Sequence, residues 1–156
     1  MNKEEVISHL RAAKSAHIKW LQKAKLLING LEIEEDAIPV NSTECNFGKW
    51  FYSNGQILNG LSNNPIECMN SIEQLHFDLH DVYMKIFTVY FTNKKQSGFF
   101  AKLFKLKRKR ISEKEHAMAE SYYDEMEKIS TLLLENINKL ERRLIAVSDE
   151  KIKALV

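Results

Sequence analysis

The sequence contains little proline, glycine or cysteine, with two Pro, five Gly and two Cys among 156 residues. A fold of many short strands needs many tight turns, and these turns depend on Gly and Pro. The composition therefore argues against a sandwich or barrel and favours helices. Two Cys residues also exclude a disulfide scaffold, and nothing else in the sequence indicates an oxidising compartment.

The chain also lacks a long apolar segment. Its first 30 residues alternate charged and apolar positions without the apolar run of a signal peptide. No stretch approaches the roughly 18 apolar residues that a membrane-spanning helix requires. We therefore expect a soluble, cytoplasmic protein. The length fits a single domain over residues 1–156. The initial Met with a frayed tail over residues 149–156 is consistent with a complete small protein, and a piece of a larger protein is the alternative.

Positive and negative charges are nearly balanced but unevenly placed. Lys and Arg number 23 against 21 Asp and Glu, which gives a formal net charge of +2. Residues 94–110 contain eight Lys or Arg and no acidic residue, so the rest of the chain carries a net charge of −6. Any attraction to phosphate or anionic lipid is therefore confined to this basic segment.

Apolar residues recur every three or four positions over most of the chain, which is the period of an amphipathic helix. The predicted helices cover residues 2–29, 46–58, 64–92 and about 113–146. Capping signals begin three of them: Asn2 with Glu5, Asn64 with Pro65, and Ser112 with Glu115. Three long helices and a short one predict an all-α fold, an antiparallel four-helix bundle in which Cys45 begins the short helix.

The apolar stripes predict which side chains fill the core. The stripe of the first helix consists of Val6, Leu10, Ala13, His17, Leu21, Ala24 and Ile28. That of the third helix consists of Met69, Ile72, His76, Leu79, Tyr83, Phe87 and Tyr90. That of the last helix consists of Met118, Tyr122, Met126, Ile129, Leu133, Leu140 and Leu144.

Histidine and cysteine stand at informative places on these helices. His76 and His80 are four residues apart, so both imidazoles point to the same side of a helix. His17 lies on the apolar stripe of the first helix, and Cys45 precedes the short helix. A lone HxxxH pair is common, and a single His on an apolar stripe is more often a hydrogen-bonded core residue than a metal ligand.

Three helices, however, each offer a ligand-type side chain toward the bundle interior. Burying three imidazoles and a thiol without a common partner leaves several polar groups to satisfy separately. Three nitrogens and one thiolate complete the tetrahedral shell that Zn²⁺ prefers. From the spacing alone, a zinc site and a packed polar core both remain open.

The spacing also resembles that of a known family. The sequence reads H-x-x-W from His17, then C-x-F-G-x-W from Cys45 after a gap of 24 residues, and H-x-x-x-H from His76 after a further gap of 25 residues. This pattern is similar to that of the chemoreceptor zinc-binding (CZB) domain. The resemblance covers residues 17–80 and every position of the pattern. It implies a helical bundle that holds one Zn²⁺ per chain through His17, Cys45, His76 and His80. The supporting positions, implied to pack the ligand helices and to let the Cys loop approach closely, are Trp20, Phe47, Gly48 and Trp50.

Members of this family are regulatory modules of bacterial cytoplasmic signalling proteins, in chemotaxis or with diguanylate cyclases. The resemblance therefore implies a sensor of zinc, or of oxidants through a zinc-bound Cys45, with a separate output protein as partner and a homodimer as the assembly. At a helix N-terminus and on zinc, Cys45 would be a thiolate, the form that oxidants attack. We expect residues 41–60 to be the part that moves.

Catalysis is not expected. A site closed by four protein ligands leaves no position for a reactive water, and the sequence offers no nucleophile-and-base set or Gly-rich phosphate loop. A di-iron bundle of the hemerythrin type also uses HxxxH, but it needs about twice the ligands, including carboxylates.

The basic segment 94–110 supports an alternative function. Its Lys and Arg alternate with Phe99, Phe100 and Phe104, a pattern that fits weak contact with an anionic membrane, while zinc would be purely structural. Phosphates of nucleic acid are a less favoured partner. A basic loop whose aromatic residues cover the core is the interpretation that we favour over both.

The remaining candidates are expected to be structural. His9 lies about 12 Å from His17 along a helix, too far to share a metal, and His116 begins the last helix; both are predicted to be surface or structural residues. Cys68 is predicted to be a packed thiol, with pairing to Cys45 under oxidation as the alternative. The acidic residues near the ligands, expected to be solvated but able to orient imidazole N–H groups, are Glu44, Asp78 and Asp81.

Overall fold

The computed structural model describes residues 2–31, 41–63, 65–91 and 110–155. Its helices are α1 (Lys3–Ile28), α2 (Asn46–Ser53), the 3-10 helix η2 (Gly55–Gly60), α3 (Pro65–Phe91), α4 (Glu113–Ile145) and α5 (Asp149–Lys153). No strand occurs within these described ranges. The all-α prediction is therefore confirmed.

Capping explains where two of the long helices begin. The side chain of Asn2 accepts from the backbone N–H of Glu5, and the Glu5 carboxylate accepts from the backbone N–H of Asn2, at 2.9 Å in both cases. The same reciprocal box joins Ser112 and Glu115 at the start of α4. These boxes satisfy backbone donors that no helical carbonyl reaches. The predicted cap at residue 64 lies outside the described residues.

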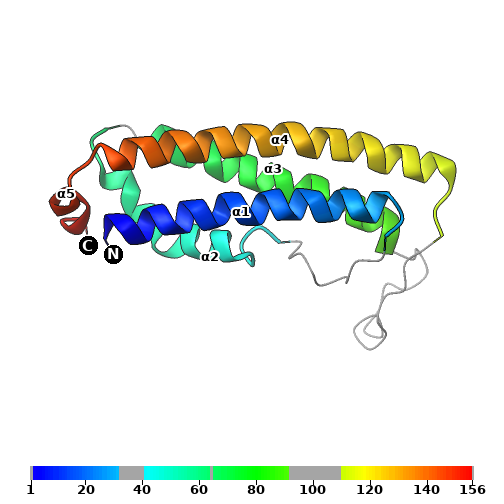
Figure 1. The fold of residues 1–156 in the computed structure, drawn as a ribbon, viewed down its shortest axis with the longest axis horizontal. Helices are drawn as coiled ribbons and strands as arrows, with labels where there is room; N and C mark the ends of the chain where they lie inside the picture. Colours follow the sequence, from blue (N-terminus) through cyan, green and yellow to red (C-terminus); the bar gives the residue numbers. More distant parts are fainter. Residues whose placement is uncertain (1, 32–40, 64, 92–109, 156) are drawn as a thin grey trace, which may run out of the picture.

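The three long helices lie side by side, and α4 packs along both α1 and α3 (Figure 1). The short α2 lies against α1, and η2 packs on α3. The second predicted helix, 46–58, is in fact two pieces, because α2 ends at Ser53. The Ser53 hydroxyl donates to the carbonyl of Lys49 at 2.6 Å, a bond that competes with the helical ladder.

The core follows the predicted stripes with one-residue shifts in α1 and at the start of α4. Three further residues predicted to be in the core are only half-buried, and these are Phe87, Tyr122 and Ile129. Trp20 is only 6% exposed, whereas the predicted core residue Leu21 is half-buried. Met118, also predicted to be in the core, is 42% exposed, and its neighbour Ala119 is fully buried. One residue turns a helix by 100°, so the buried face of α4 is displaced by one position at its first turns. A small Ala in the core position lets α4 approach its neighbours closely.

The tail that was expected to fray is folded. Residues 149–153 form α5, and the side chain of Ile152 is fully buried. Lys3 fixes the turn before α5, because its Nζ donates to the carbonyls of Ile145 at 2.9 Å and Val147 at 2.6 Å. The sequence signal was weak because a five-residue helix shows no apolar period.

Two further predictions concern the basic segment and the absence of a membrane-spanning helix. The basic segment 94–110 lies outside them except for Arg110, which is exposed, so its role stays a prediction from the sequence. Among the described helices, none combines the length and the apolar character needed to cross a membrane.

Candidate metal centre

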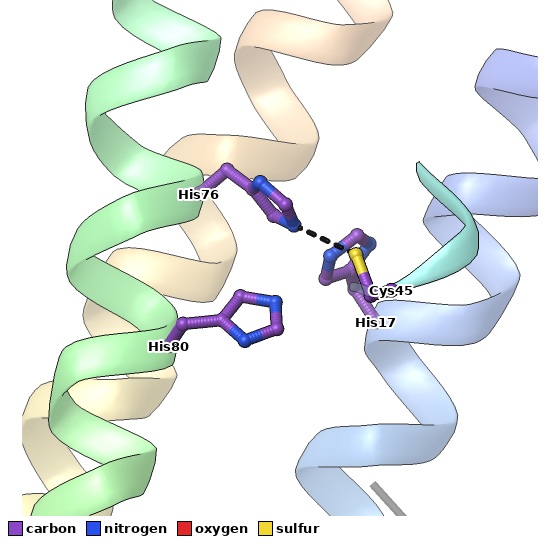
Figure 2. A group of neighbouring side chains, drawn as sticks. All are labelled: His17, Cys45, His76 and His80. Carbon is purple, nitrogen blue, oxygen red and sulfur yellow. Dashed lines mark hydrogen bonds between the residues drawn. The ribbon is translucent and has the colours of Figure 1, made fainter. Parts of the chain in front are cut away.

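Four side chains from three parts of the chain converge inside the bundle (Figure 2). They are His17 from α1, Cys45 from the residue preceding α2, and His76 and His80 from α3. One nitrogen or sulfur atom from each lies within 4.8 Å of the corresponding atom of every other. This is the only such group of ligand-type side chains found in the described part of the chain. The structure therefore brings together all four residues that the sequence singled out.

The three imidazoles are shielded from water. His17, His76 and His80 are 3%, 1% and 3% exposed. The HxxxH pair on α3 places its two ring centroids 4.7 Å apart, and the ring of His17 lies 5.1 Å from that of His76 across the gap between α1 and α3. Polar groups buried at this depth need partners, which a shared cation would supply.

Cys45 reaches the histidines because of the tight turn that starts α2. Its Sγ accepts from the backbone N–H of Gly48 at 3.2 Å, lies 3.4 Å from the carbonyl oxygen of Ser42, and is 3.3 Å from Nε2 of His76. A Cβ added to Gly48 would lie 1.9 Å from the Ser42 oxygen. Only glycine allows this approach, which confirms the role that the resemblance implied for Gly48.

Burial favours the neutral state that a metal requires in two of the imidazoles, His17 and His76. The Nδ1–H of His17 donates to the carbonyl of Ala13 at 2.7 Å, which leaves Nε2 free to face the cluster. Burial lowers the pKa of His17, and this hydrogen bond offsets only part of the effect. Burial, followed by the neighbouring His17 and His80, lowers the pKa of His76 to about 2.

The pKa of Cys45 in the metal-free chain shows how much the predicted thiolate would depend on zinc. Burial raises the pKa of Cys45, and it outweighs the backbone N–H groups of Gly48 and Phe47 and the positive charge of Lys49, which lower the pKa. The helix N-terminus alone therefore does not make Cys45 a thiolate. A cation at the site is needed to remove its proton.

The arrangement fits zinc. With ligand bonds of about 2.0–2.3 Å, the donor atoms of a tetrahedral zinc site lie roughly 3.3–3.8 Å apart. The Sγ of Cys45 and Nε2 of His76 already have this separation. The ligand atoms of the whole group lie within 4.8 Å of one another, so zinc binding would require them to move only slightly closer together. Three neutral imidazoles and one thiolate also match the ligand preferences of Zn²⁺.

Aromatic side chains surround the four residues. Trp20 lies 4.3 Å from the ring of His80, and Phe47 presents its ring edge-on to His17 at 5.7 Å and to His76 at 5.0 Å. Both aromatic residues are buried. They fill the space around the imidazoles and limit the orientations available to each ring.

The other His and Cys residues lie elsewhere, as predicted. His9 is exposed and stacks on Trp50 at 5.1 Å, and His116 lies 3.5 Å from the hydroxyl of Tyr90. Cys68 is a buried free thiol that accepts from Nη1 of Arg143 at 2.7 Å.

The acidic residues near the ligands have other roles. Asp78 accepts from Gln74, Asp81 pairs with Lys85, and Glu44 is exposed. The acceptor that orients His17 is instead the backbone carbonyl of Ala13, which sequence reasoning missed. The only signal for it is position, since residue 13 lies one helical turn before His17.

Comparison with known proteins points to the same residues. Residues 17–87 match the family model described as the chemoreceptor zinc-binding domain, a segment that contains all four members of the cluster and spans just under half of the chain. The resemblance seen in the sequence is thereby confirmed. No curated protein and no solved structure matches the chain. The family match and the cluster together fit a zinc-binding module.

Proposed function

We propose that residues 17–87, which belong to the chemoreceptor zinc-binding domain family, hold one Zn²⁺ per chain through His17, Cys45, His76 and His80. In this proposal the chain is a sensory module of bacterial cytoplasmic signalling and not an enzyme. The observation that carries it is the convergence of three buried imidazoles and one thiol, contributed by three separate elements, on one point.

A zinc ion at this point would act as a cross-link. It would join α1, the start of α2 and α3, which are three separate elements of the described chain. Binding requires loss of the Cys45 proton, so the affinity is expected to fall at low pH. Four protein ligands would leave zinc no position for a substrate or a reactive water, which supports a sensory rather than a catalytic role.

The ligands differ in their access to solvent. Cys45 is partly exposed, whereas the three imidazoles are buried. A hydroperoxide would therefore reach the sulfur first. The thiolate attacks one peroxide oxygen, the O–O bond breaks, and the products are the sulfenic acid of Cys45 and a hydroxide or alkoxide. The sulfur then binds zinc more weakly, which would convert an oxidant signal into loss of a ligand. Zinc concentration itself is the alternative signal.

Residues 41–60 are the segment that we propose to move. Of the four ligands, only Cys45 lies in this segment. Outside the metal centre, Trp50 stacks on His9 of α1, and Tyr52 interacts with Glu73 of α3. His9 and Tyr52 are exposed, but Trp50, Phe51 and Leu58 of this segment are buried, so the movement would have to loosen the packing of α2 and η2 on α1 and α3. Faster hydrogen exchange in α2 after zinc removal would support this movement, and unchanged protection of α2 would refute it.

Metal content is the test of the proposal. Elemental mass spectrometry on protein purified without added metal or an affinity tag should find about one zinc per chain. Replacement of Cys45 or His80 by Ala should remove most of it. The matched controls are Cys68→Ala and His116→Ala, which lie outside the cluster and should retain zinc. A folded wild-type protein without metal would contradict the proposal.

The signalling role requires partners. We propose a homodimer, which rests on the family and on the apolar faces of the first and last helices, and a separate output protein, which rests on the family. Sedimentation of the zinc-loaded chain tests the dimer directly. A monomer at all accessible concentrations would refute it and leave the zinc proposal intact.

The basic segment 94–110 favours a second candidate function, weak attachment to an anionic membrane. Co-sedimentation with vesicles that contain phosphatidylserine should then occur at low salt and disappear at high salt. Binding that does not depend on anionic lipid, or no binding, would refute this candidate.

A further inference from the structure

The C-terminal helix α5 occupies a socket formed by the start of α1 and the end of η2. One wall is the start of α1, against which α5 packs (Figure 1). The other wall is the end of η2, where a Cβ added to Gly60 would lie 2.8 Å from Cδ2 of Leu155. Ile152 is fully buried and is the main apolar side chain of α5.

Few contacts hold α5 in this socket. The backbone N–H of Lys3 donates to Oδ1 of Asp149 at 3.3 Å, an exposed and long hydrogen bond. Leu155 is only partly buried. A helix of five residues is far too short to be stable alone in water, because nucleation costs more than so few hydrogen bonds return. The helical state of α5 therefore depends on its docking.

The walls of the socket carry two of the four proposed zinc ligands. α1 contains His17, and the segment 41–60, which ends at Gly60, contains Cys45. A bond from zinc to each of these residues would fix the position of α2 and η2 relative to α1. Without that link, the two walls are held by the packing of α2 on α1 and of η2 on α3. Because α5 touches both walls, it would be the element most sensitive to a shift between them.

We infer that the docking of α5 is coupled to the zinc site, so that α5 is released when zinc or the Cys45 ligand is lost. This inference rests on the proposed zinc binding. The coupling must be reciprocal, because two equilibria that share one conformational change affect each other by the same factor. Zinc would strengthen the docking of α5, and docked α5 would raise the affinity for zinc.

Hydrogen exchange on the full chain tests the first half of this coupling. The useful amides are those of Ile152, Ala154 and Leu155, which donate to the carbonyls of Ser148, Glu150 and Ile152 within and just after α5. Removal of zinc with a chelator should accelerate their exchange by roughly 5- to 150-fold, the usual range for coupled sites. Amides in the middle of α4 should stay protected, which shows that the bundle persists.

Zinc affinity, measured by competition with a chromogenic chelator, tests the second half. Ile152→Asp places a charge in the socket and should weaken zinc binding by the same factor. The control Lys151→Ala changes an exposed residue of the same helix and should leave the affinity unchanged. Circular dichroism of the zinc-loaded variants shows whether the bundle is folded.

The outcomes separate the inference from the proposal on which it rests. If the wild-type protein binds no zinc, the proposed function fails. If zinc binds but exchange in α5 does not change, or if Ile152→Asp binds zinc as tightly as the wild type, the inference is overturned and the zinc site stands. If zinc removal also accelerates exchange in α4, hydrogen exchange does not distinguish α5 from the rest of the bundle. The inference then stands if Ile152→Asp binds zinc more weakly than Lys151→Ala and is overturned if the two bind zinc equally.

Discussion

The indole ring of Trp20 lies against the imidazole ring of His80, with centroids 4.3 Å apart and planes inclined by 53°. Trp20 also meets the ring of Tyr83 at 5.1 Å and is 6% exposed. It is therefore in contact with a proposed zinc ligand and shielded from bulk water. A change in the charge or position of the His80 ring would alter the electronic surroundings of the indole.

This contact predicts that Trp20 fluorescence reports zinc binding. The variant Trp50→Phe leaves Trp20 as the only Trp in the chain. Addition of zinc to this metal-free variant should change the emission until about one equivalent is bound. The complementary variant Trp20→Phe keeps only Trp50, which does not contact His80 in the ring geometry described, and should respond less. An equal response from both variants would show that the signal comes from a global change.

The turn at Gly48 predicts a second effect. In Gly48→Ala, the new methyl group would collide with the carbonyl of Ser42, so the loop must shift and carry Sγ of Cys45 with it. Zinc affinity should fall by about 10- to 100-fold, the usual cost of disturbing residues that orient metal ligands.

Gly55 provides the matched control for this change. It is a buried glycine of the same segment, but a Cβ added there would meet only the ring and carbonyl of Trp50, at 3.4 Å or more. Gly55→Ala should therefore retain its affinity for zinc. If both Ala variants bind zinc like the wild type in the chelator competition, the tight turn does not position Cys45.

Local sequence signals were sufficient for most of the fold. The capping boxes at Asn2 and Ser112 fix where α1 and α4 begin, because these effects act over four residues or fewer. The apolar period gives the inward side of both helices except over the first turns of α4. The fold of α5 was missed because it depends on Lys3 and on Gly60, which are distant in sequence. No local pattern contains that information.

The candidate metal centre likewise has parts that the sequence predicts and parts that only the folded structure shows. The spacing of His76 and His80 and the place of His17 on an apolar stripe were enough to predict that these residues meet, and the structure brings them together with Cys45. That they bind zinc remains a prediction. The carbonyl of Ala13 was not predictable as an acceptor, since every residue has a backbone carbonyl and only the folded geometry selects one.

The stack of His9 on Trp50 predicts a variant that loosens α2. The rings are 5.1 Å apart and inclined by 14°, and they join α1 to α2 outside the metal centre. An aromatic pair of this kind contributes about 0.5–1.5 kcal/mol, so its loss should raise the open population of α2 by roughly 2- to 12-fold. In metal-free His9→Ala, iodoacetamide should modify Cys45 faster, by at most this factor, because Cys45 is already partly exposed in the closed state.

Two comparisons make this test specific. His9→Phe keeps a flat ring over Trp50 and should restore the slow modification of Cys45. Cys68 is buried on another part of α3, so its peptide, resolved by mass spectrometry, should react equally in all variants. Parallel acceleration at both thiols would indicate general destabilisation and contradict a local role for the stack.

A cluster of charges between α1 and α4 predicts the response of stability to acid. The carboxylate of Glu141 accepts from Nζ of Lys14 at 2.6 Å and from Nε of Arg11 at 2.7 Å, and Lys14 also donates to Asn138 at 2.8 Å. The hydrogen bond from Lys14 is the main cause that holds the pKa of Glu141 below its ordinary value of 4.5, with Arg11 adding to it and burial opposing it.

Because this pKa is lower in the folded than in the unfolded state, the unfolded chain binds the proton first as the pH falls. The stabilisation by Glu141 is therefore fully present above the ordinary pKa of 4.5 and is lost as the pH falls through the lower, folded pKa. At pH 7, Glu141→Gln should reduce the free energy of unfolding by about 1.5–3 kcal/mol, the range for hydrogen bonds to charged groups.

Thermal unfolding of the metal-free protein over a series of pH values measures this difference and avoids the pH dependence of zinc binding. The gap between the wild type and Glu141→Gln should be constant from pH 7 to the ordinary pKa of 4.5 and then narrow. Glu135→Gln changes an exposed residue of the same helix and should follow the wild type throughout. A gap that stays constant into strong acid would mean that Glu141 acts through its shape alone, because protonation would then leave its contribution unchanged.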